Sequence, residues 1–127
     1  MGLTYNTYLS SPSRIYGCKK CKTHLAINED IISRAFRGQH GKAYLFENVV
    51  NVTTLSPQDR NMTTGRHTVR DIVCRGCNET VGWKYDRAYE TREQYKEGKF
   101  ILEAELWVLC VNNADRSVNE GGEGQRM

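Results

Sequence analysis

Long apolar runs are missing from this sequence of 127 residues. No apolar stretch approaches the roughly 20 consecutive residues that a membrane-spanning helix requires, so we expect a soluble chain with no membrane partner. The first residues also lack the order of basic and then apolar residues that is typical of a secretory signal. Gly2 raises the question of N-myristoylation, but Asn6 stands where that signal needs Ser or Thr, and we expect no lipid anchor.

The sequence also lacks a large excess of charge of one sign. The chain has 18 Lys and Arg residues against 15 Asp and Glu residues, which gives a formal net charge of +3. Such a mild excess does not by itself indicate binding to nucleic acid. Hydrophobic residues make up 39% and charged residues 26% of the chain, a balance that is typical of globular proteins. At this length we expect a single domain.

The two ends of the chain differ in composition from its middle. Residues 1–14 are polar, and residues 112–127 combine glycines with polar side chains. Neither stretch has enough apolar surface to form a core. We therefore predict a flexible lead-in at 1–14, a folded domain at 15–111 and a disordered tail at 112–127.

Between those ends the apolar pattern is short in range, as in β-strands. A tight turn at Glu47 and Asn48 is expected to join the first two strands. Residues 100–109 fit a helix or a strand on periodicity, and their strand neighbours and bulky first residues favour a strand. A short helical turn is expected around residues 93–97. The expected strands cover residues 43–46, 49–55, 67–73 and 100–109.

The five cysteines carry the strongest signal in the sequence. Four of them form two Cys-x-x-Cys pairs, Cys18 with Cys21 and Cys74 with Cys77. This spacing lets both sulfurs of a tight turn face one ion, and two such turns supply the four thiolates of a tetrahedral zinc site. The alternatives are unrelated reduced thiols or one redox-active pair, but a thioredoxin-type pair should begin a helix in a βαβ pattern, which is not visible here. We therefore predict one structural zinc ion.

The surroundings of the two pairs favour a closed, structural site. Four thiolates carry more negative charge than one zinc ion neutralises, and nearby cations help to offset the excess. These cations are Lys19, Lys20, Lys22 and Arg75. Gly17 and Gly76 supply backbone freedom where amides must turn toward the sulfurs. Because four cysteines leave no open coordination position, metal-activated hydrolysis is not expected.

His24 and Cys110 are the other residues that metal or thiol chemistry would use. His24 follows Cys21 by three residues and could replace a cysteine as a ligand, although with four cysteines available a surface or hydrogen-bonding role is favoured. Cys110 stands alone, and a small core residue near the last strand is favoured over a nucleophile. Paired thiols in a chain without a visible secretory signal are typical of a reducing compartment. We therefore expect the cytoplasm and the nucleus.

Several short motifs stand at fixed distances from the two cysteine pairs. They are Cys18-x-x-Cys21, Gly41-x-Ala43-Tyr44-Leu45-Phe46, Val49-Val50-Asn51-Val52, Thr64-Gly65-x-His67, Cys74-x-x-Cys77, Gly82-Trp83-Lys84-Tyr85 and Tyr95-Lys96-Glu97-Gly98-Lys99-Phe100-Ile101-Leu102-Glu103. With these motifs, residues 16 to about 106 resemble the Yippee family of zinc-binding proteins. The opening residues 1–5 and residues 22–25 look like the fungal branch of that family. Residues 58–60 and 66–71 are similar to a branch linked to the CTLH/GID-type ubiquitin ligase.

The resemblance implies an all-β fold called the β-tent, in which two antiparallel sheets meet at a steep angle and are pinned by one four-cysteine zinc site. The same fold occurs in methionine sulfoxide reductases B, in the ligand-binding domain of cereblon, in centromere assembly factors and in an RNA-sensing helicase domain, so fold alone does not decide function. The reductase needs a thiol nucleophile in the strand that corresponds to residues 98–102. Ile101 stands at that position, and we expect no enzyme activity.

An aromatic cage of the cereblon type would be only half complete in this chain. Two of its four walls match Trp83 and Tyr85, while the other two positions fall on Val69 and Thr63. A groove beside the two aromatic residues could take a peptide, a small cyclic imide or a methylated cation. The alternative is that Trp83 and Tyr85 only pack where the sheets meet.

The function expected from these features is that of a non-enzymatic zinc-binding interaction module. The leading hypothesis is a protein–protein interaction role as an accessory or regulatory subunit of a CTLH/GID-type ubiquitin ligase. The alternative is a ligand, peptide or degron reader that uses the aromatic groove. Weak RNA binding is the third hypothesis, because several basic residues share one stretch, although acidic residues interrupt it and dilute its field. The basic residues are Arg66, Arg70, Arg75, Lys84 and Arg87.

Overall fold

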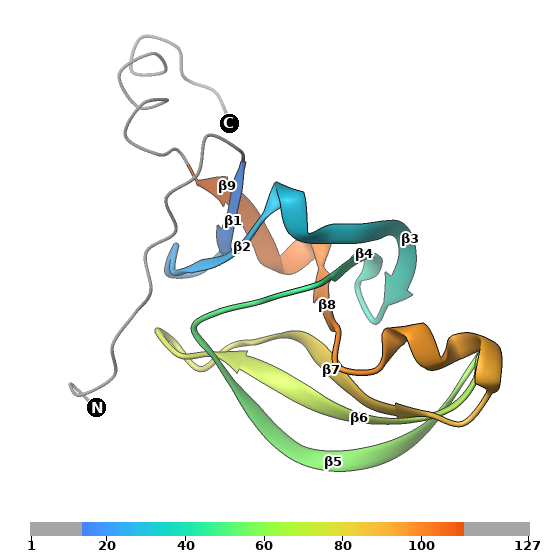
Figure 1. Ribbon diagram of the computed structural model, residues 1–127. Helices are drawn as coiled ribbons and strands as arrows, with labels where there is room; N and C mark the ends of the chain where they lie inside the picture. Colours follow the sequence, from blue (N-terminus) through green and yellow to red (C-terminus); the bar gives the residue numbers. More distant parts are fainter. Residues whose placement is uncertain (1–13, 111–127) are drawn as a thin grey trace, which may run out of the picture.

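The described part of the chain folds mainly into β-strands, with three short 3-10 helices between them (Figure 1). The computed structural model describes residues 14–110. Its elements are β1 (Ile15–Cys18), β2 (His24–Ile27), η1 (Asn28–Asp30), β3 (Ile31–Gly38), β4 (Gly41–Phe46), β5 (Val52–Met62), β6 (Gly65–Cys74), β7 (Thr80–Ala88), η2 (Thr91–Lys96), β8 (Phe100–Glu103), η3 (Ala104–Leu106) and β9 (Trp107–Cys110). Apart from Arg14, the expected lead-in and tail lie outside the described residues. Within residues 14–110 no helix is long and apolar enough to cross a membrane.

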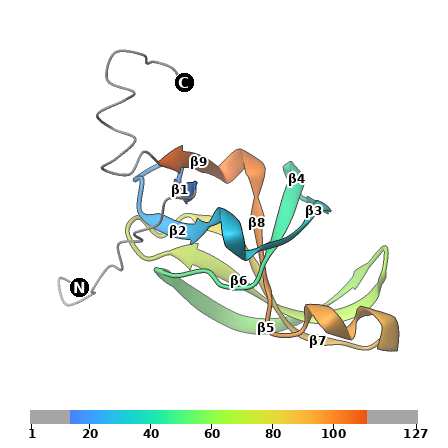
Figure 2. The same ribbon diagram turned by 45° about the horizontal axis from the view of Figure 1, so that its top comes forward.

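The strands form two antiparallel sheets. The smaller sheet has the order β2-β1-β9, and the larger has the order β3-β4-β8-β7-β6-β5. β3 and β5 are therefore the two edges of the larger sheet, and Figure 2 shows this sheet bending upward from β5 toward β4 and β3. This arrangement confirms the expected all-β fold class. The strand expected at 67–73 lies within β6, and the helical turn expected at 93–97 overlaps η2.

Alternation along the strands divides the apolar side chains of the larger sheet between its two faces. On one face, buried side chains pack with residues of the smaller sheet and form the core between the sheets. Its members include Tyr16, Leu25, Phe46, Ile72 and Leu102. On the opposite face, a second cluster contains Ala43, Leu45, Val69, Trp83, Tyr85 and Ile101. The larger sheet therefore has one face buried against its partner sheet and another that carries an apolar cluster of its own.

The tight turn predicted at Glu47 and Asn48 is wrong. β4 and β5 are not neighbours, since three strands separate them in the larger sheet. Residues 47–51 instead form a link across the molecule, in which the Val50 amide donates to the Leu25 carbonyl of β2 at 2.8 Å. Val49 packs on the core between the sheets. The apolar residues of this link are therefore explained by core packing, and β5 begins only at Val52.

The single strand predicted at 100–109 is also wrong. The stretch is divided into β8, which pairs in the larger sheet, and β9, which pairs with β1 in the smaller sheet, with η3 between them. The ring of Trp107 lies 4.5 Å from that of Tyr16, in edge-to-face geometry. This contact attaches β9 to the smaller sheet, so one apolar stretch serves both sheets.

Candidate functional site

The two Cys-x-x-Cys segments fold into the same turn, each at the end of a strand. Cys18 ends β1 and Cys74 ends β6. In each turn the amide four residues later donates to the carbonyl of the first cysteine, from Lys22 at 2.8 Å and from Asn78 at 2.7 Å. The amide of the first cysteine donates to the carbonyl one residue further on, at 2.9 and 2.8 Å. The turns are therefore one structural motif used twice.

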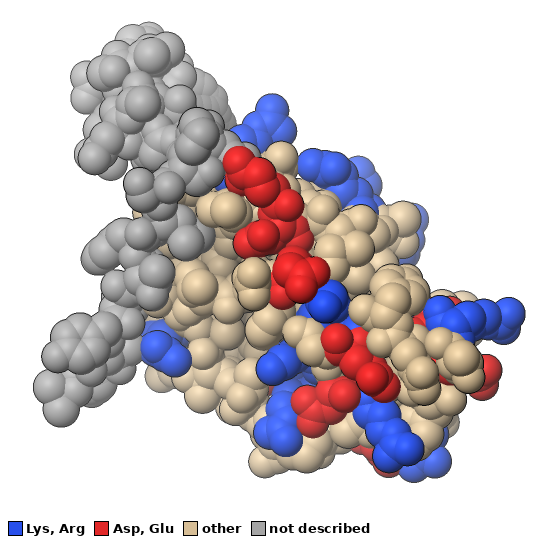
Figure 3. Space-filling model, in the orientation of Figure 1, with Lys and Arg blue, Asp and Glu red and all other residues tan. Residues whose placement is uncertain are grey.

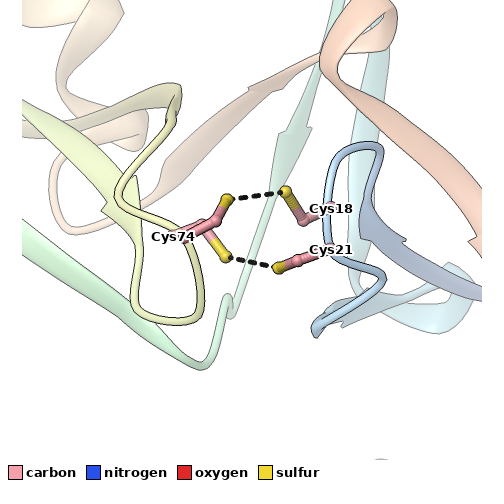
Figure 4. Close-up of side chains that lie close together, drawn as sticks. Cys18, Cys21 and Cys74 are labelled. Carbon is pink, nitrogen blue, oxygen red and sulfur yellow. Dashed lines mark hydrogen bonds between the residues drawn. The ribbon is translucent and has the colours of Figure 1, made fainter. Parts of the chain in front are cut away.

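The four sulfur atoms of these turns lie together (Figure 4). The Cys18 and Cys77 sulfurs are 3.6 Å apart, those of Cys21 and Cys74 are 3.5 Å apart, and all four lie within 4.8 Å of one another. Zinc–sulfur bonds of about 2.3 Å place the sulfurs of a tetrahedral site about 3.8 Å apart. The cluster therefore matches the size and the donor chemistry of one four-thiolate zinc ion.

Each sheet supplies one half of this cluster. The first pair follows β1 of the smaller sheet, and the second pair follows β6 of the larger one. A metal ion bound to all four sulfurs would join the two sheets through two segments, residues 18–21 and 74–77, that are distant in sequence. Across the same gap, the exposed side chains of Lys20 and Glu79 form an ion pair of 3.1 Å. The metal would therefore stabilise the junction between the sheets.

The thiols differ in how readily they lose a proton. Burial alone raises the pKa of Cys21, but hydrogen bonds from the hydroxyl group of Thr23, 3.0 Å away, and from its backbone outweigh that effect and bring the pKa to about 7. Burial is the main cause that raises the pKa of Cys77 to about 12. Because zinc binds thiolates, metal binding must displace protons from the cluster.

Gly76 is required for close approach between the two turns rather than for backbone freedom. A Cβ atom at this position would lie 2.3 Å from the Thr23 Oγ1 atom and 2.9 Å from the Cys21 sulfur. Gly17 is similar, because a Cβ atom there would lie 2.3 Å from the Cys110 sulfur. Neither glycine has a positive φ angle, so the expected reason for these two glycines is corrected.

The positive φ angles of the turns belong to Lys22 at 67° and Asn78 at 65°. This left-handed conformation costs about 1–2 kcal/mol for an ordinary residue and less for Asn. We therefore expect Lys22→Gly to raise the free energy of unfolding of the zinc-loaded protein by about 0.5–1 kcal/mol, as part of that gain is lost to the greater chain entropy of glycine. Urea unfolding measures it, and Asn78→Gly is the matched control with a smaller gain. A destabilised Lys22→Gly variant would contradict the assignment.

His24 and Cys110 lie outside the cluster of four thiols. His24 is half-buried in β2, and its carbonyl accepts a hydrogen bond from the Asn51 side chain at 2.8 Å. Cys110 is half-buried at the end of β9, where burial raises the pKa of its thiol. Its sulfur faces the Lys22 carbonyl at 3.8 Å.

A groove of about 1010 Å³ lies on the face of the larger sheet that carries the second apolar cluster. Trp83 and Tyr85 of β7 line it, together with residues of β3, β5 and η2. Thr63, at the turn between β5 and β6, is exposed and also lines the groove, whereas Val69 is fully buried in the apolar cluster with Trp83 and Tyr85. Three of the four expected cage positions therefore reach the groove, and the fourth lies in the core.

Trp83 and Tyr85 are also core residues, at 7% and 2% exposure. Their rings meet edge to face with centres 6.2 Å apart. Burial raises the pKa of the Tyr85 hydroxyl group to about 12, and the Trp83 indole acts in the opposite direction. The indole Nε1 is buried and makes no hydrogen bond of good geometry within residues 14–110. The two aromatic residues therefore pack in the sheet and border the groove at once.

Sequence reasoning missed two residues of the groove lining, Phe36 and Lys96. Phe36 adds an aromatic ring, and Lys96 packs against that ring and the ring of Tyr85. The Lys96 side chain is only 3% exposed, and its ammonium group lies 2.8 Å from the Glu93 carboxylate. It stands 5.2 Å from the Phe36 ring centre and 5.3 Å from that of Tyr85. The sequence showed a charge-rich segment here, which is ordinarily exposed, so only the fold identifies the buried lysine.

Two of the five basic residues expected to share one stretch are paired with acids. Arg66 contacts the Asp59 carboxylate at 2.6 Å, and Arg70 contacts that of Asp86 at 2.8 Å. In Figure 3, basic and acidic side chains alternate over the lower part of this face, and acidic side chains form a column above them. This view shows a mixed surface and no continuous basic face.

The fold and the cysteine cluster define a small all-β domain with a four-cysteine metal centre that joins two sheets. The family model described as "Yippee zinc-binding/DNA-binding /Mis18, centromere assembly" matches residues 14–121. The chain therefore belongs to the Yippee-Mis18 family, and the resemblance seen in its motifs is confirmed. Since this family is zinc-binding and the four cysteines are positioned to hold one metal ion, the expected zinc cofactor is confirmed too.

Similar proteins come from plants and animals. The chain is 53% identical over 90 residues to a yippee-like protein of Arabidopsis thaliana, covering 71% of this chain and 85% of that protein. It is 48% identical over 100 residues to protein yippee-like 4 of Homo sapiens, covering 79% of each. The crystal structure of the Mis18 "Yippee-like" domain matches with a TM-score of 0.62 at 13% identity, over 77% of this chain and 95% of that one. The last match shows a shared fold.

Proposed function

We propose that this chain is a non-enzymatic interaction module that serves as an accessory or regulatory subunit of a CTLH/GID-type ubiquitin ligase. Four thiols are available for one metal ion, so a bound zinc ion would have no open position for water or substrate. Its role would then be to hold the two sheets together. Ile101, at the place where a reductase of this fold carries its nucleophile, is a fully buried apolar residue.

The single observation that supports the ligase role is the order of the hairpin formed by β5 and β6. This hairpin contains the two stretches that are similar to the ligase-linked branch, and β5 is an exposed edge strand. Asp59 accepts hydrogen bonds from Arg66 and from Thr68, both at 2.6 Å. Arg60 pairs with Asp71 at 2.9 Å. Asp59, Arg66 and Thr68 thus form a preordered polar surface on one face of the hairpin, suitable for a protein partner, and the Arg60–Asp71 pair lies on the other face.

A second candidate function, that of a peptide or ligand reader, is favoured by the groove over Trp83 and Tyr85. The groove is large and borders buried aromatic residues. The two functions are compatible because Asp59, Arg66 and Thr68 of the hairpin lie outside the groove lining, although Arg60 belongs to both surfaces. The ligase role predicts that variants of the hairpin lose ligase subunits. The reader role predicts that variants of the groove lose a different partner.

Affinity purification with mass spectrometry separates the two functions. The double variant Asp59→Arg with Arg66→Asp exchanges the two charges, keeps their ion pair and changes the surface presented by the hairpin. We expect it to lose ligase subunits, whereas Trp83→Phe, which keeps an aromatic ring, should retain them and lose any partner held in the groove. Near-UV circular dichroism must show both variants folded. Failure of the wild-type protein to recover ligase subunits would overturn the leading proposal.

A further inference from the structure

We infer that Thr23 is a positioning residue of the metal centre, because its hydroxyl group holds the thiolate of Cys21, the most exposed of the four zinc ligands. Through this hydrogen bond Thr23 sets how tightly zinc is bound and how slowly the Cys21 thiolate reacts with electrophiles. This role is independent of the ligase and reader functions. Three features support it: the exposure of the four sulfurs, their hydrogen-bond donors and the contacts that fix the Thr23 side chain.

The four ligands differ in how far solvent reaches them. Cys18 and Cys74 are buried, at 1% and 0% exposure, and Cys77 is half-buried, whereas Cys21 is exposed. Cysteine reacts as the thiolate, and an electrophile must also reach the sulfur. Cys21 is therefore the ligand at which the metal centre is open to reaction.

Cys21 is also the ligand with a hydrogen bond from a hydroxyl side chain. The Thr23 Oγ1 atom lies 3.0 Å from the Cys21 sulfur. A sulfur that binds zinc has lost its proton, so the hydroxyl group is the donor. Within residues 14–110, Cys74 accepts from the Gly76 amide at 3.3 Å and Cys77 from the backbone of Glu79, and the other contacts of these sulfurs are with the sulfurs of the cluster.

The second turn shows what this position does without a hydroxyl group. Glu79 follows Cys77 by two residues, as Thr23 follows Cys21. A carboxylate only accepts hydrogen bonds at neutral pH, so it cannot donate to a thiolate. The Glu79 side chain instead pairs with Lys20 of the first turn at 3.1 Å. The two turns share one backbone hydrogen-bond pattern, and only the first has a side-chain donor at this position.

The Thr23 side chain is fixed between the two turns. Its backbone carbonyl accepts from the Cys18 amide at 2.9 Å. A Cβ atom at Gly76 would lie 2.3 Å from the Thr23 Oγ1 atom, so the hydroxyl group packs directly on the backbone of the second turn. Four thiolates carry more negative charge than one zinc ion neutralises, and donors around the ligands offset part of the excess. A hydroxyl group held in place here stabilises the exposed thiolate.

Two substitutions at Thr23 separate its hydroxyl group from its packing. Thr23→Val removes the hydroxyl group and keeps the volume of the side chain, while Thr23→Ser keeps the hydroxyl group. Thr80→Val is the matched control, because Thr80 is exposed beside the second turn and makes no hydrogen bond to a sulfur within the described residues.

Three measurements on the full chain test the inference. Competition with a chelator gives the zinc dissociation constant. Brief alkylation of the zinc-loaded protein with N-ethylmaleimide, followed by mass spectrometry of the singly alkylated product, gives the rate at each cysteine. Co²⁺ in place of zinc gives the wavelength of the sulfur-to-metal charge-transfer band, which reports directly on the electron density at the thiolates.

In the wild-type protein we expect Cys21 to be alkylated first among the four ligands. Thr23→Val should weaken zinc binding roughly tenfold, as expected for loss of a hydrogen-bond partner of a ligand. It should speed up alkylation of Cys21 relative to Cys77 roughly threefold to tenfold. A sulfur that has lost its donor gives up electrons more readily, so the Co²⁺ band should move to longer wavelength. Thr23→Ser and Thr80→Val should stay close to the wild-type values.

Four results would overturn the inference. Alkylation of Cys77 before Cys21 in the wild-type protein would show that Cys21 is not the open ligand. Equal losses in Thr23→Val and Thr23→Ser would assign the effect to packing and not to the hydroxyl group. Equal acceleration at all four ligands in Thr23→Val, with an unmoved Co²⁺ band, would show a general loss of stability. Wild-type zinc affinity and alkylation rates in Thr23→Val would show that the hydrogen bond has no effect on the metal centre.

Discussion

Cys74→Ser is expected to abolish stoichiometric zinc binding and to unfold most of the domain. The Cys74 thiol is fully buried between the sheets, with its sulfur 3.5 Å from that of Cys21. Zinc binding by thiolates is worth about 10–16 kcal/mol in small zinc-folded peptides, while a whole domain is stable by only about 5–15 kcal/mol. A serine hydroxyl group is not a ligand of comparable strength for zinc. Loss of this one sulfur therefore removes the connection between the two sheets.

Zinc content per chain and near-UV circular dichroism measure this loss. Cys110→Ser is the matched control, because it exchanges the same atoms at a half-buried thiol outside the cluster. We expect it to keep one zinc ion and a near-native spectrum. A strong chelator added to the wild-type protein should reproduce the spectrum of Cys74→Ser. Retention of zinc and tertiary signal by Cys74→Ser, or their loss in Cys110→Ser, would contradict the ligand assignment.

The metal centre could be predicted from the sequence because its information is local. Each turn needs only the spacing of two cysteines, and the doubled spacing is specific. The structure adds that both turns share one hydrogen-bond pattern and that Lys22 and Asn78 occupy the same left-handed position. Asn at that position is a recognisable signal, whereas Lys is not.

The connections between the sheets could not be predicted in this way. Val49 and Val50 look like the start of a strand, but they are apolar because they pack against the smaller sheet. Residues 100–109 look like one strand, although the chain changes sheets at η3. In both cases an apolar residue satisfies the pattern whether it pairs in a ladder or fills the space between two sheets. Long-range packing decides which of these two roles the residue takes, and the local sequence pattern does not predict that packing.

For the groove, too, the sequence predicted only some of the residues that form it. Trp83, Tyr85 and Thr63 were expected there and do line it, but the residues that determine its chemistry come from three other elements. Lys96 is buried only because η2 folds against β7 and places its ammonium group between two rings. Whether the groove binds a ligand stays a prediction, which the affinity purification of Trp83→Phe tests.

Gly82→Ala is expected to be the most damaging substitution outside the metal centre. Gly82 pairs with Leu102 at the centre of the larger sheet, where β7 meets β8. A Cβ atom at this position would lie 1.8 Å from the Ile101 carbonyl oxygen and 3.2 Å from the Leu102 Cα atom. These are backbone atoms, so no side-chain rotation can relieve the clash, and the two strands must separate. We expect a loss of about 4 kcal/mol or more in the free energy of unfolding, which is at the severe end for single substitutions.

Urea unfolding of the zinc-saturated protein measures that loss, and Gly41→Ala separates steric from conformational effects. Gly41 has a φ angle of 109°, and a Cβ atom there would meet nothing within 4 Å, so alanine costs only backbone strain of about 1–3 kcal/mol. If Gly82→Ala is destabilised less than Gly41→Ala, the close approach of β7 and β8 is not as tight as described. If Gly82→Ala is destabilised more than Gly41→Ala and also binds zinc more weakly, strand pairing in the larger sheet is coupled to metal binding at the end of β6. That coupling is expected because β8 leads through η3 into β9, which pairs with the strand that ends in Cys18.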